Sequence, residues 1–565
     1  MIPKSKTAAF AFLAAGLAAT ASHAAFTWEN CKDIAATDFN VVPIATRETD
    51  QAAEPMKMAF DLLAAPGEDA KGKVDVYFTE RLGKVRKFDS KTGRVITLAT
   101  FTLNINQSVS SDGVLGIALD PAFKSNHQVY IYYTFISTAE KNWRVSRFTL
   151  NAAHDQLNLA SEAVVIKIPI HGGSKHPGGA LQFDNFGDLW ITTGNDYYNG
   201  DFPVWSSANT NDLRGKILRI HPLATAGADG KLYSIPEGNL YKAGTASTKP
   251  EIYIMGTRNP YTLTLDPARR WALWGDVGPD NTNMDGQPMN GSGSVEKTEE
   301  YDLAQEAGNY GYPFFSGDTR MKAGIDPAGP VIPDNTNWDG NTPGLKTLPP
   351  AVAPLYPYKK SCAITGPLYR YDGDLVSSIK WPPHFQRKWF VSDFNGDNNK
   401  IKALTLDDAG KKVTGEEFIP GISLHSPLDI QSGPDGALYV NNYGGVWRAS
   451  EKNTGLIRIE YKGDCRPALP KLEGATSIAD QGARPGSPSR QAPRVDISQV
   501  DGLSVSVATA GRFTVEVRDL AGRPLASRSS QGPAPVAFAE VREAGVYFLR
   551  VGTAEGSQVL KVVRN

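Results

Sequence analysis

A short strand pattern that recurs six times constrains the fold of this chain more than any other feature of its sequence. Each copy is rich in aromatic and β-branched residues, and several follow a turn of the Asp-Gly or Asn-Phe-Gly-Asp kind. Recurring small sheets predict a β-propeller, in which each blade buries its faces against its neighbours. The copies lie at Val74–Thr79, Gln128–Thr134, Asp188–Thr193, Arg270–Gly275, Lys388–Ser392 and Ala437–Asn441, and several precede a second strand, as at Lys216–Ile220 and Gly455–Ile459.

The six copies therefore predict an all-β protein with a six-bladed β-propeller. The alternative is a sandwich of unrelated hairpins, which the length of 565 residues disfavours. The abundance of turn-forming residues, 54 Gly and 38 Pro, agrees with the all-β class. The formal net charge is -1 and no Lys/Arg run stands out, so nucleic acid is not expected as the main partner.

Residues 1–24 have the pattern of a secretory signal peptide. Lys4 and Lys6 form a basic start, Ala8–Ala19 is an apolar run, and Ser22-His23-Ala24 is a small-x-small cleavage site. A membrane anchor is the alternative, but the apolar run is shorter than a bilayer-spanning helix requires, and no later transmembrane segment is evident. We therefore expect an exported protein, either secreted or held at the cell surface or in the periplasm.

The rest of the chain divides into three parts by composition. Residues 25–465 hold the propeller, and residues 466–494 are rich in Pro, Gly, Ser, Ala and Gln, as flexible linkers are. Residues 495–565 return to short strands with period-two alternation, which predicts a small Ig-like β-sandwich. Its last strands, Gly545–Val551 and Gln558–Val563, resemble the sorting (FlgD-like) modules that end many exported bacterial proteins.

Three cysteines remain after the signal peptide, and an exported protein can keep a disulfide. Cys31 lies at the start of the large domain and Cys465 at its end. A bridge between them would fasten the two ends of a ring and is the preferred pairing, with Cys362 left over. The sequence does not fix this connectivity, so the other pairings stay open.

His176 is the candidate catalytic residue that the local sequence singles out. It lies in a glycine-rich loop, 171–180, shortly before the strand Leu189–Thr193. Glycines leave a histidine with little side-chain cover, and an imidazole titrates near neutral pH. These properties suit proton abstraction from a bound molecule. For this residue alone, a turn histidine without a chemical role is the alternative.

An ordered set of motifs along the propeller resembles the glucose/sorbosone dehydrogenase family, the soluble sugar dehydrogenases that use pyrroloquinoline quinone (PQQ). The resemblance runs from about Val74 to about Tyr461 and implies a six-bladed propeller with its site at one mouth. The motifs are, in order, Ser111–Phe123, Val129–Tyr133, Arg144–Phe148, the His176 loop, Leu213–Ile220, Gly256–Pro260, Gly275–Pro279, Glu299–Glu300 and Gly308–Pro313.

This resemblance implies the catalytic roles of two residues. His176 would be the general base that takes the proton from the anomeric hydroxyl of a sugar as hydride leaves for PQQ. Arg258 and Asn259 match the Arg-Asn pair that contacts the cofactor. A guanidinium beside a quinone oxygen would stabilise the negative charge that builds there.

The resemblance also implies calcium. Gly278 and Pro279 match backbone carbonyls that hold the catalytic Ca²⁺, and carbonyl oxygens are suitable ligands for this hard cation. Glu300 and Tyr310 match positions of a second, structural calcium site. The partners implied are a sugar substrate and an external electron acceptor.

The chain departs from the family pattern where PQQ carboxylates are bound. Ser111-Asp112 stands where family members that bind PQQ tightly carry Gln or Glu, and the stretches Ser392–Asn399 and Ser423–Asp429 lack the family's lysine and arginines. Burying three carboxylates without cations is costly. Lys175, Lys400 and His425 are candidate replacements, and Lys400 and His425 complete the predicted cofactor-binding set.

Three other functions remain open. A calcium-dependent lactonase or other hydrolase would need acidic ligands converging at the mouth, for which Asp276, Asp280 and Glu300 are the candidates. A non-catalytic propeller could bind carbohydrate through its surface tryptophans and tyrosines. A dehydrogenase could use a quinone other than PQQ. The prediction is an exported oxidoreductase that acts on an aldose or related sugar with PQQ and Ca²⁺.

Overall fold

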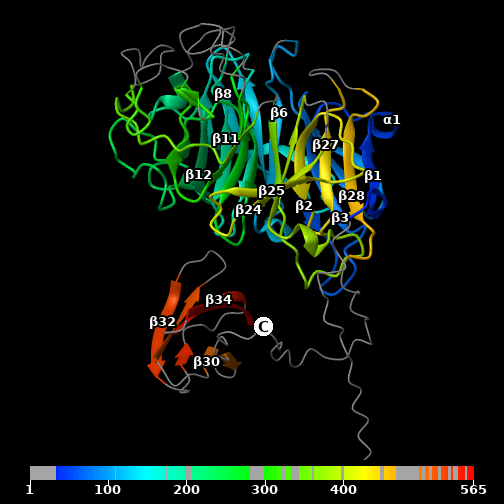
Figure 1. Cartoon of the computed structure of the whole chain (residues 1–565), viewed down its shortest axis with the longest axis vertical. Coiled ribbons are helices and arrows are strands. Elements are labelled where there is room, and N and C mark those ends of the chain that lie inside the picture. The colour runs from blue at the N-terminus through cyan, green and yellow to red at the C-terminus, as the bar shows by residue number, and fades with distance from the viewer. Residues whose placement is uncertain are drawn as a thin grey trace, which may run out of the picture.

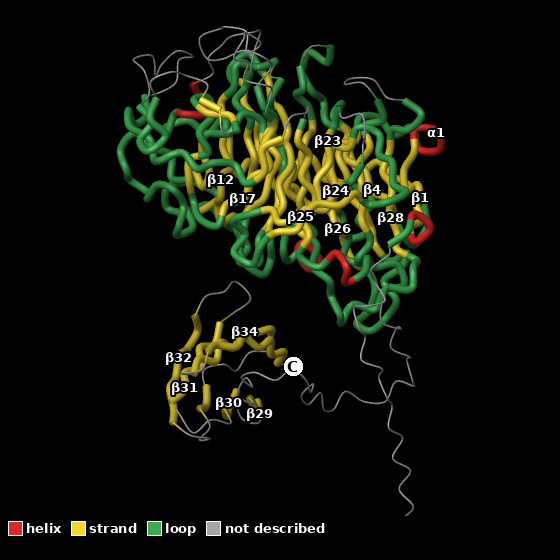
Figure 2. Tube along the Cα trace, viewed as in Figure 1, coloured by secondary structure: helices red, strands yellow, loops and turns green. Residues whose placement is uncertain are grey.

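The computed structural model describes residues 34–465 except 109, 174, 198–204, 280–297, 318, 321–324, 332–342, 359–361, 396–399 and 446–450, together with the C-terminal strands given below. The predicted signal peptide, Cys31, the linker 466–494 and Asp280 lie outside the described residues. Strands and loops make up most of what is described, with few and short helices (Figure 2). No helix among the described residues is long and apolar enough to cross a membrane.

Six sheets follow one another along residues 39–461 and form the blades of a propeller, and Figure 1 shows their strands side by side. Their strands pair antiparallel, except that β18 pairs parallel with β14. Each sheet contains one of the six strands predicted from the recurring pattern, always as its second strand: β3, β7, β11, β16, β23 and β27. The all-β fold with a six-bladed propeller is therefore confirmed.

The bounds of the blades are as follows. The first three are β2 (Pro55–Leu62), β3 (Val74–Glu80), β4 (Lys84–Asp89) and β5 (Arg94–Thr100); β6 (Val114–Leu119), β7 (Gln128–Ile136), β8 (Lys141–Leu150) and β9 (Leu157–Pro169); and β10 (Leu181–Phe183), β11 (Leu189–Thr193), β12 (Lys216–Pro222) and β14 (Ile252–Met255), with β13 (Tyr233–Ser234) and β18 (Gly308–Asn309) added. The last three are β15 (Pro260–Leu265), β16 (Ala272–Asp276), β17 (Glu299–Ala304) and β21 (Tyr356–Tyr358); β22 (Ala363–Leu368), β23 (Lys388–Asp393), β24 (Lys402–Leu406) and β25 (Val413–Phe418); and β26 (Pro427–Ser432), β27 (Leu438–Asn442), β28 (Gly455–Tyr461) and β1 (Phe39–Thr46).

The remaining short elements lie in loops. They are α1 (Arg47–Asp50), α2 (Phe123–Asn126), the 3-10 helices at Ala36–Asp38, Trp205–Ala208 and Pro383–Phe385, and the small hairpin of β19 (Phe315–Ser316) and β20 (Thr319–Arg320).

The ring closes because strands from the two ends of the domain pair within the last blade. β1 pairs antiparallel with β28, from Phe39 opposite Tyr461 to Thr46 opposite Gly455, so the N-terminal strand is the outermost strand of the last blade. The innermost strands β2, β6, β10, β15, β22 and β26 contact one another in that order, and β26 contacts β2 again. The sequence pattern does not predict this pairing of β1 with β28.

The core consists of the interfaces between blades. On β16, Trp274 lies in the cluster shared with Trp190 of the preceding blade, whereas Leu273 lies in the cluster shared with Trp389 of the following blade. Both faces of a second strand are thus buried, and β3, β11, β16 and β27 are buried along their whole length. This explains their continuous runs of apolar and aromatic residues.

The cysteines agree with the preferred pairing as far as it can be followed. Cys465 is disulfide-bonded. Cys362 carries a thiol, and Asn395 Nδ2 donates to its Sγ at 3.3 Å.

The C-terminal part forms two sheets that share one apolar cluster. One sheet has the order β29 (Val495–Ser498), β30 (Leu503–Val507) and β33 (Val536–Phe538). The other has the order β32 (Pro524–Gln531), β31 (Arg512–Arg518), β34 (Gly545–Thr553) and β35 (Gly556–Arg564). Val505 and Phe538 of the first sheet join Phe513, Val515 and Leu549 of the second in this cluster.

Close packing between blades generates a stability prediction at Gly116 on β6. A Cβ at this position would lie 2.1 Å from the Gly179 carbonyl oxygen of the neighbouring blade and 3.2 Å from Tyr132 Cβ. We expect Gly116→Ala to lower the free energy of unfolding by about 1–3 kcal/mol, the usual cost of overpacking, as measured by chemical denaturation. The control is Gly415→Ala on β25, where the nearest atom would be 3.8 Å away. Equal stability of the two variants would contradict this packing.

Candidate active site

The predicted site residues converge because of where they stand relative to the innermost strands. His176 lies in the loop that precedes β10, and Arg258 and Asn259 directly precede β15, so both loops open on the same mouth of the ring. Gly278 follows β16, whose last residue Asp276 is paired with the first residue of β15, Pro260. Loops from two blades therefore meet at this mouth.

His176 is buried, with 8% of its surface exposed, and its ring is fixed on two sides. Its Nδ1 lies 2.8 Å from Asn195 Oδ1, and the ring of Tyr197 stacks on it with a centroid distance of 5.1 Å. Because an amide oxygen only accepts hydrogen bonds, Nδ1 carries the hydrogen in the neutral ring. Nε2 is then the atom that can take a proton, which is the arrangement required of a general base.

One hydrogen bond from the His176 loop and one from the segment after β11 tie this blade to the Arg258–Asn259 turn of the next blade. The Asn195 amide donates to the Arg258 carbonyl oxygen at 2.8 Å, and the Gly178 amide donates to Asn259 Oδ1 at 3.1 Å. The structure therefore places the His176 loop beside Arg258 and Asn259, three of the residues that the sequence predicts for one site.

Arg258 also reaches the turn at Gly278. Its Nη1 donates to the Val277 carbonyl oxygen at 3.1 Å, and the Gly278 amide donates to Glu299 Oε2 at 3.0 Å. A Cβ at Gly278 would lie 1.9 Å from the Thr298 carbonyl oxygen, so only glycine fits there. This fixed turn places the backbone of residues 277–279 beside a guanidinium.

The described residues contain no group of three or more His, Cys, Asp or Glu arranged to hold a metal ion. The prediction that backbone carbonyl oxygens of Gly278 and Pro279 hold a cation does not rely on such a group.

Asp276 supports the turn rather than facing a ligand. Its Oδ2 accepts from the Arg258 amide at 2.8 Å and its Oδ1 from the Asn259 amide at 2.7 Å. Burial raises the pKa of Asp276 to about 6, although these hydrogen bonds act in the opposite direction. Both oxygens are occupied by backbone donors, which disfavours Asp276 as a metal ligand of a hydrolase.

Glu300 lies opposite Asp276 on β17 and is also buried. Burial, and then the neighbouring Asp276, raise the pKa of Glu300 to about 8, and the Gly317 amide donates to its carboxyl group. Tyr310 is buried as well; its hydroxyl donates to the Leu303 carbonyl oxygen at 3.2 Å, and its ring meets the edge of Trp274.

The proposed replacements for the missing cations lie in different places. Lys400 is exposed, and its Nζ lies 5.8 Å from the ring of Phe418, at the end of the outermost strand of its blade. His425 is half-buried before β26, and its Nδ1 lies 3.3 Å from Asn453 Nδ2. Lys175 is the nearest to His176, because its Nζ lies 5.6 Å from the ring of Tyr197 that stacks on the histidine.

The residues that orient the candidate site were not predicted from the sequence. Asn195 and Asp196 directly follow the strand β11, and polar residues at a strand end that faces a glycine-rich loop are the signal that could have revealed them. Asp196 is almost fully buried and pairs with His171 Nδ1 at 2.9 Å and with Arg214 Nη1 at 3.1 Å. This network supports the loop that carries His176.

The fold and this cluster define a six-bladed propeller with a fixed histidine and a fixed guanidinium at one mouth. The model of the Glucose / Sorbosone dehydrogenase family matches residues 68–446. The chain belongs to this family, as its motifs predicted.

Known proteins support the same assignment. An uncharacterized protein of Synechocystis is 25% identical over 402 residues, which cover 68% of this chain and 81% of that protein. Quinoprotein glucose dehydrogenase B of Acinetobacter calcoaceticus is 26% identical over 263 residues, or 43% of this chain and 48% of that enzyme. A crystal structure of an oxidoreductase (glucose dehydrogenase) from Thermus thermophilus shares the fold, with a TM-score of 0.51, 24% identity and coverage of 74% of this chain and 99% of that one.

The contact between the two loops can be tested through Asn259. We expect Asn259→Ala to lower the free energy of unfolding by about 1–3 kcal/mol, because the buried Gly178 amide loses its acceptor. Asn211→Ala is the control, since that side chain makes an exposed hydrogen bond to the Pro343 carbonyl oxygen. Thermal and chemical unfolding measure both variants, and an Asn259→Ala protein as stable as the control would refute the bridge between blades.

Proposed function

We propose that the propeller oxidises an aldose or related sugar at its anomeric carbon, with PQQ as the electron acceptor, Ca²⁺ as its metal and an external acceptor for the electrons. The observation that carries this proposal is the junction of His176, Arg258 and the Gly278 turn through hydrogen bonds between two blades. Membership of the family supports the reaction class.

The residues fit the reactive end of a quinone cofactor. Arg258 offers a cation, and the backbone of Gly278 and Pro279 offers the oxygen ligands that calcium prefers. When bound, PQQ would supply the acceptor for the hydride that leaves the sugar carbon. Lys175 would be a better candidate than Lys400 for pairing with a carboxylate of the cofactor, because it lies beside the ring that stacks on His176.

The chain's own residues would handle the proton and the charge. Nε2 of His176 would take the proton of the anomeric hydroxyl, which leaves a carbonyl at that carbon as the C–H bond is broken. Asn195 would hold the ring in the tautomer with its hydrogen on Nδ1, and Tyr197 would keep it in plane. Arg258, held by the Val277 carbonyl oxygen, would face the negative charge that develops on the acceptor.

The hydrolase alternative is less well supported, since Asp276 is occupied by backbone amides and Glu300 by Gly317.

We also propose that residues 495–564 form an Ig-like module of an exported protein. The pairing of β29, β30 and β33 in one sheet and of β32, β31, β34 and β35 in the other supports the Ig-like assignment. Export rests on the signal-peptide pattern of residues 1–24.

The base is tested by His176→Gln in purified protein reconstituted with PQQ and Ca²⁺. We expect sugar-dependent dye reduction to fall by a factor of about 10²–10⁴, the usual contribution of a positioned general base. The matched control is His384→Gln, because His384 pairs with Glu417 near the outer strands and should leave turnover unchanged. If His176→Gln turns over as fast as the control, His176 has no part in the mechanism. If no sugar reduces the dye with the wild-type protein and no PQQ is retained, the proposed function fails.

Calcium binding is tested without turnover. A ligand that binds only the folded state at a hundredfold excess over its dissociation constant stabilises it by about 2.7 kcal/mol. We expect Ca²⁺ to raise the unfolding temperature of the full chain and EGTA to reverse this rise. Mg²⁺ at the same concentration should give a smaller rise, because Mg²⁺ loses its hydration water reluctantly. An unfolding temperature that does not respond to Ca²⁺ would exclude a calcium site.

A further inference from the structure

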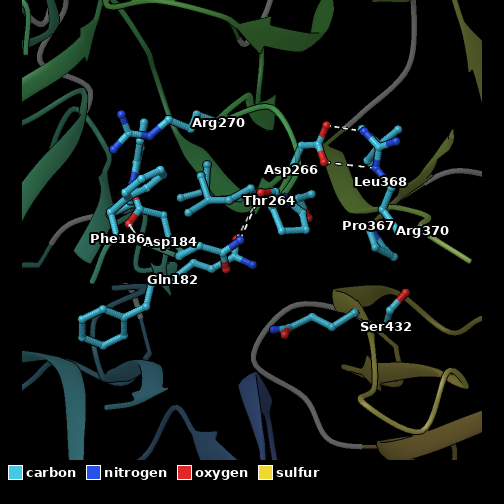
Figure 3. Close-up of a pocket in the computed structure, with 17 residues that line it drawn as sticks. Gln182, Asp184, Phe186, Thr264, Asp266, Arg270, Pro367, Leu368, Arg370 and Ser432 are labelled. Atoms are coloured by element: carbon cyan, nitrogen blue, oxygen red, sulfur yellow. Dashed lines mark hydrogen bonds and ion pairs between the residues drawn. The ribbon is translucent and has the colours of Figure 1, made fainter. Parts of the chain in front are cut away.

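A cavity of about 320 Å³, shown in Figure 3, lies at the other mouth of the ring from the candidate active site. The site described above stands before β10 and β15, whereas this cavity is lined by the residues that end the same two strands, such as Phe183 and Leu265. The ends of β22 and β26 complete it, through Leu368 and Ser432. Its volume lies in the range of about 300–1,000 Å³ that is typical of small-molecule sites.

We propose that this cavity binds a neutral saccharide, separately from the candidate active site. The proposal does not depend on the redox chemistry proposed above.

The polar groups of the cavity are held in place by the protein itself. Arg370 forms a bidentate ion pair with Asp266, drawn as two dashed lines in Figure 3. Its Nε lies 3.1 Å from Asp266 Oδ1. The Leu265 amide donates to Gln182 Oε1 at 2.9 Å, and Trp190 Nε1 donates to Asp184 Oδ2 at 3.1 Å. A ligand would therefore meet groups that need little reordering, which favours binding.

The charges of the lining cancel. Asp184 and Asp266 stand against Arg270 and Arg370, and the other lining residues carry no charge. Because Asp266 and Arg370 neutralise each other directly, neither an anion nor a cation gains a clear advantage here. A neutral ligand fits better than a charged one.

The hydrogen-bonding groups require a ligand that both donates and accepts. Gln182 uses its oxygen on Leu265 and keeps Nε2 to donate. Gln431 uses Nε2 on the Met58 carbonyl oxygen and on Asp429, and keeps Oε1 to accept. A hydroxyl group serves both, and the Ser432 hydroxyl adds a third partner. Several hydroxyls on one neutral ring are the property of a sugar.

The apolar wall suits the carbon face of a sugar ring. Phe186 is 41% exposed, and the guanidinium of Arg270 stacks over one face of its ring, 3.5 Å from the centroid, so the two planar groups stand as a stacked pair at the edge of the cavity. Phe183 and Leu263 add apolar lining beside it. Aromatic side chains commonly supply such platforms, with polar groups at the other wall to fix orientation.

The test is a titration of the full chain with maltotriose and cellotriose, followed by isothermal calorimetry and by saturation-transfer NMR. We expect one of these saccharides to bind and Phe186→Ala or Arg270→Ala to weaken binding by about three- to tenfold, the range that a stacked ring contributes. Both residues are exposed, so the variants should fold. The matched control is Phe418→Ala, a phenylalanine that is 54% exposed on β25 and outside the cavity; its affinity should equal that of the wild type.

Two results would overturn the proposal. One is that neither saccharide binds, or that Phe186→Ala and Phe418→Ala bind equally well. The other is that glucuronate or inorganic phosphate binds in a Phe186-dependent manner whereas the neutral saccharides do not. Since neither PQQ nor turnover is needed, a failure of the proposed dehydrogenase activity would leave this test intact.

Discussion

The burial of both faces of small sheets is the constraint on which this structure depends. A blade such as β15–β16–β17 has Trp274 on one face and Tyr301 on the other, so it exposes a large apolar surface unless a blade stands on each side. Only a closed ring gives every blade two neighbours. Closure in turn brings the loops before each innermost strand to one mouth, and this is how residues as distant in sequence as His176 and Arg258 come to meet.

The candidate site is a product of contacts between blades more than of any single loop. Gly116 allows the carbonyl of Gly179 to approach, and Asn259 accepts from the Gly178 amide. The carboxylate of Asp276 then accepts hydrogen bonds from the backbone amides of Arg258 and Asn259. A general base needs a fixed tautomer and a fixed position, and in the proposed site the Asn195 side chain would set the tautomer of His176 while these contacts hold the loops that carry it.

The sequence predicts the number of blades and singles out His176 as the candidate base, but it does not predict the closure of the ring or the residues that support the candidate site. Second strands such as β3 and β16 are buried on both faces, so their apolar runs stand out. The innermost strands do not, because they carry residues such as Lys57 in β2 and Pro367 in β22. The sequence does not predict Asn195 and Tyr197 as site residues, because each acts through its contact with His176. The order of the motifs predicts Lys400 as a cofactor ligand, whereas its side chain lies over the ring of Phe418.

The pairing of β1 with β28 has a consequence for how this domain is made. The two partners are separated by nearly the whole propeller sequence, so β1 is made first and stays without its partner until synthesis has passed Tyr461. Until then β1 presents an open row of backbone donors and acceptors, the kind of edge that joins other chains. An emerging chain is thus exposed to aggregation at its N-terminal strand, and a chaperone that keeps this strand apart from other chains until β28 appears would suit its biogenesis.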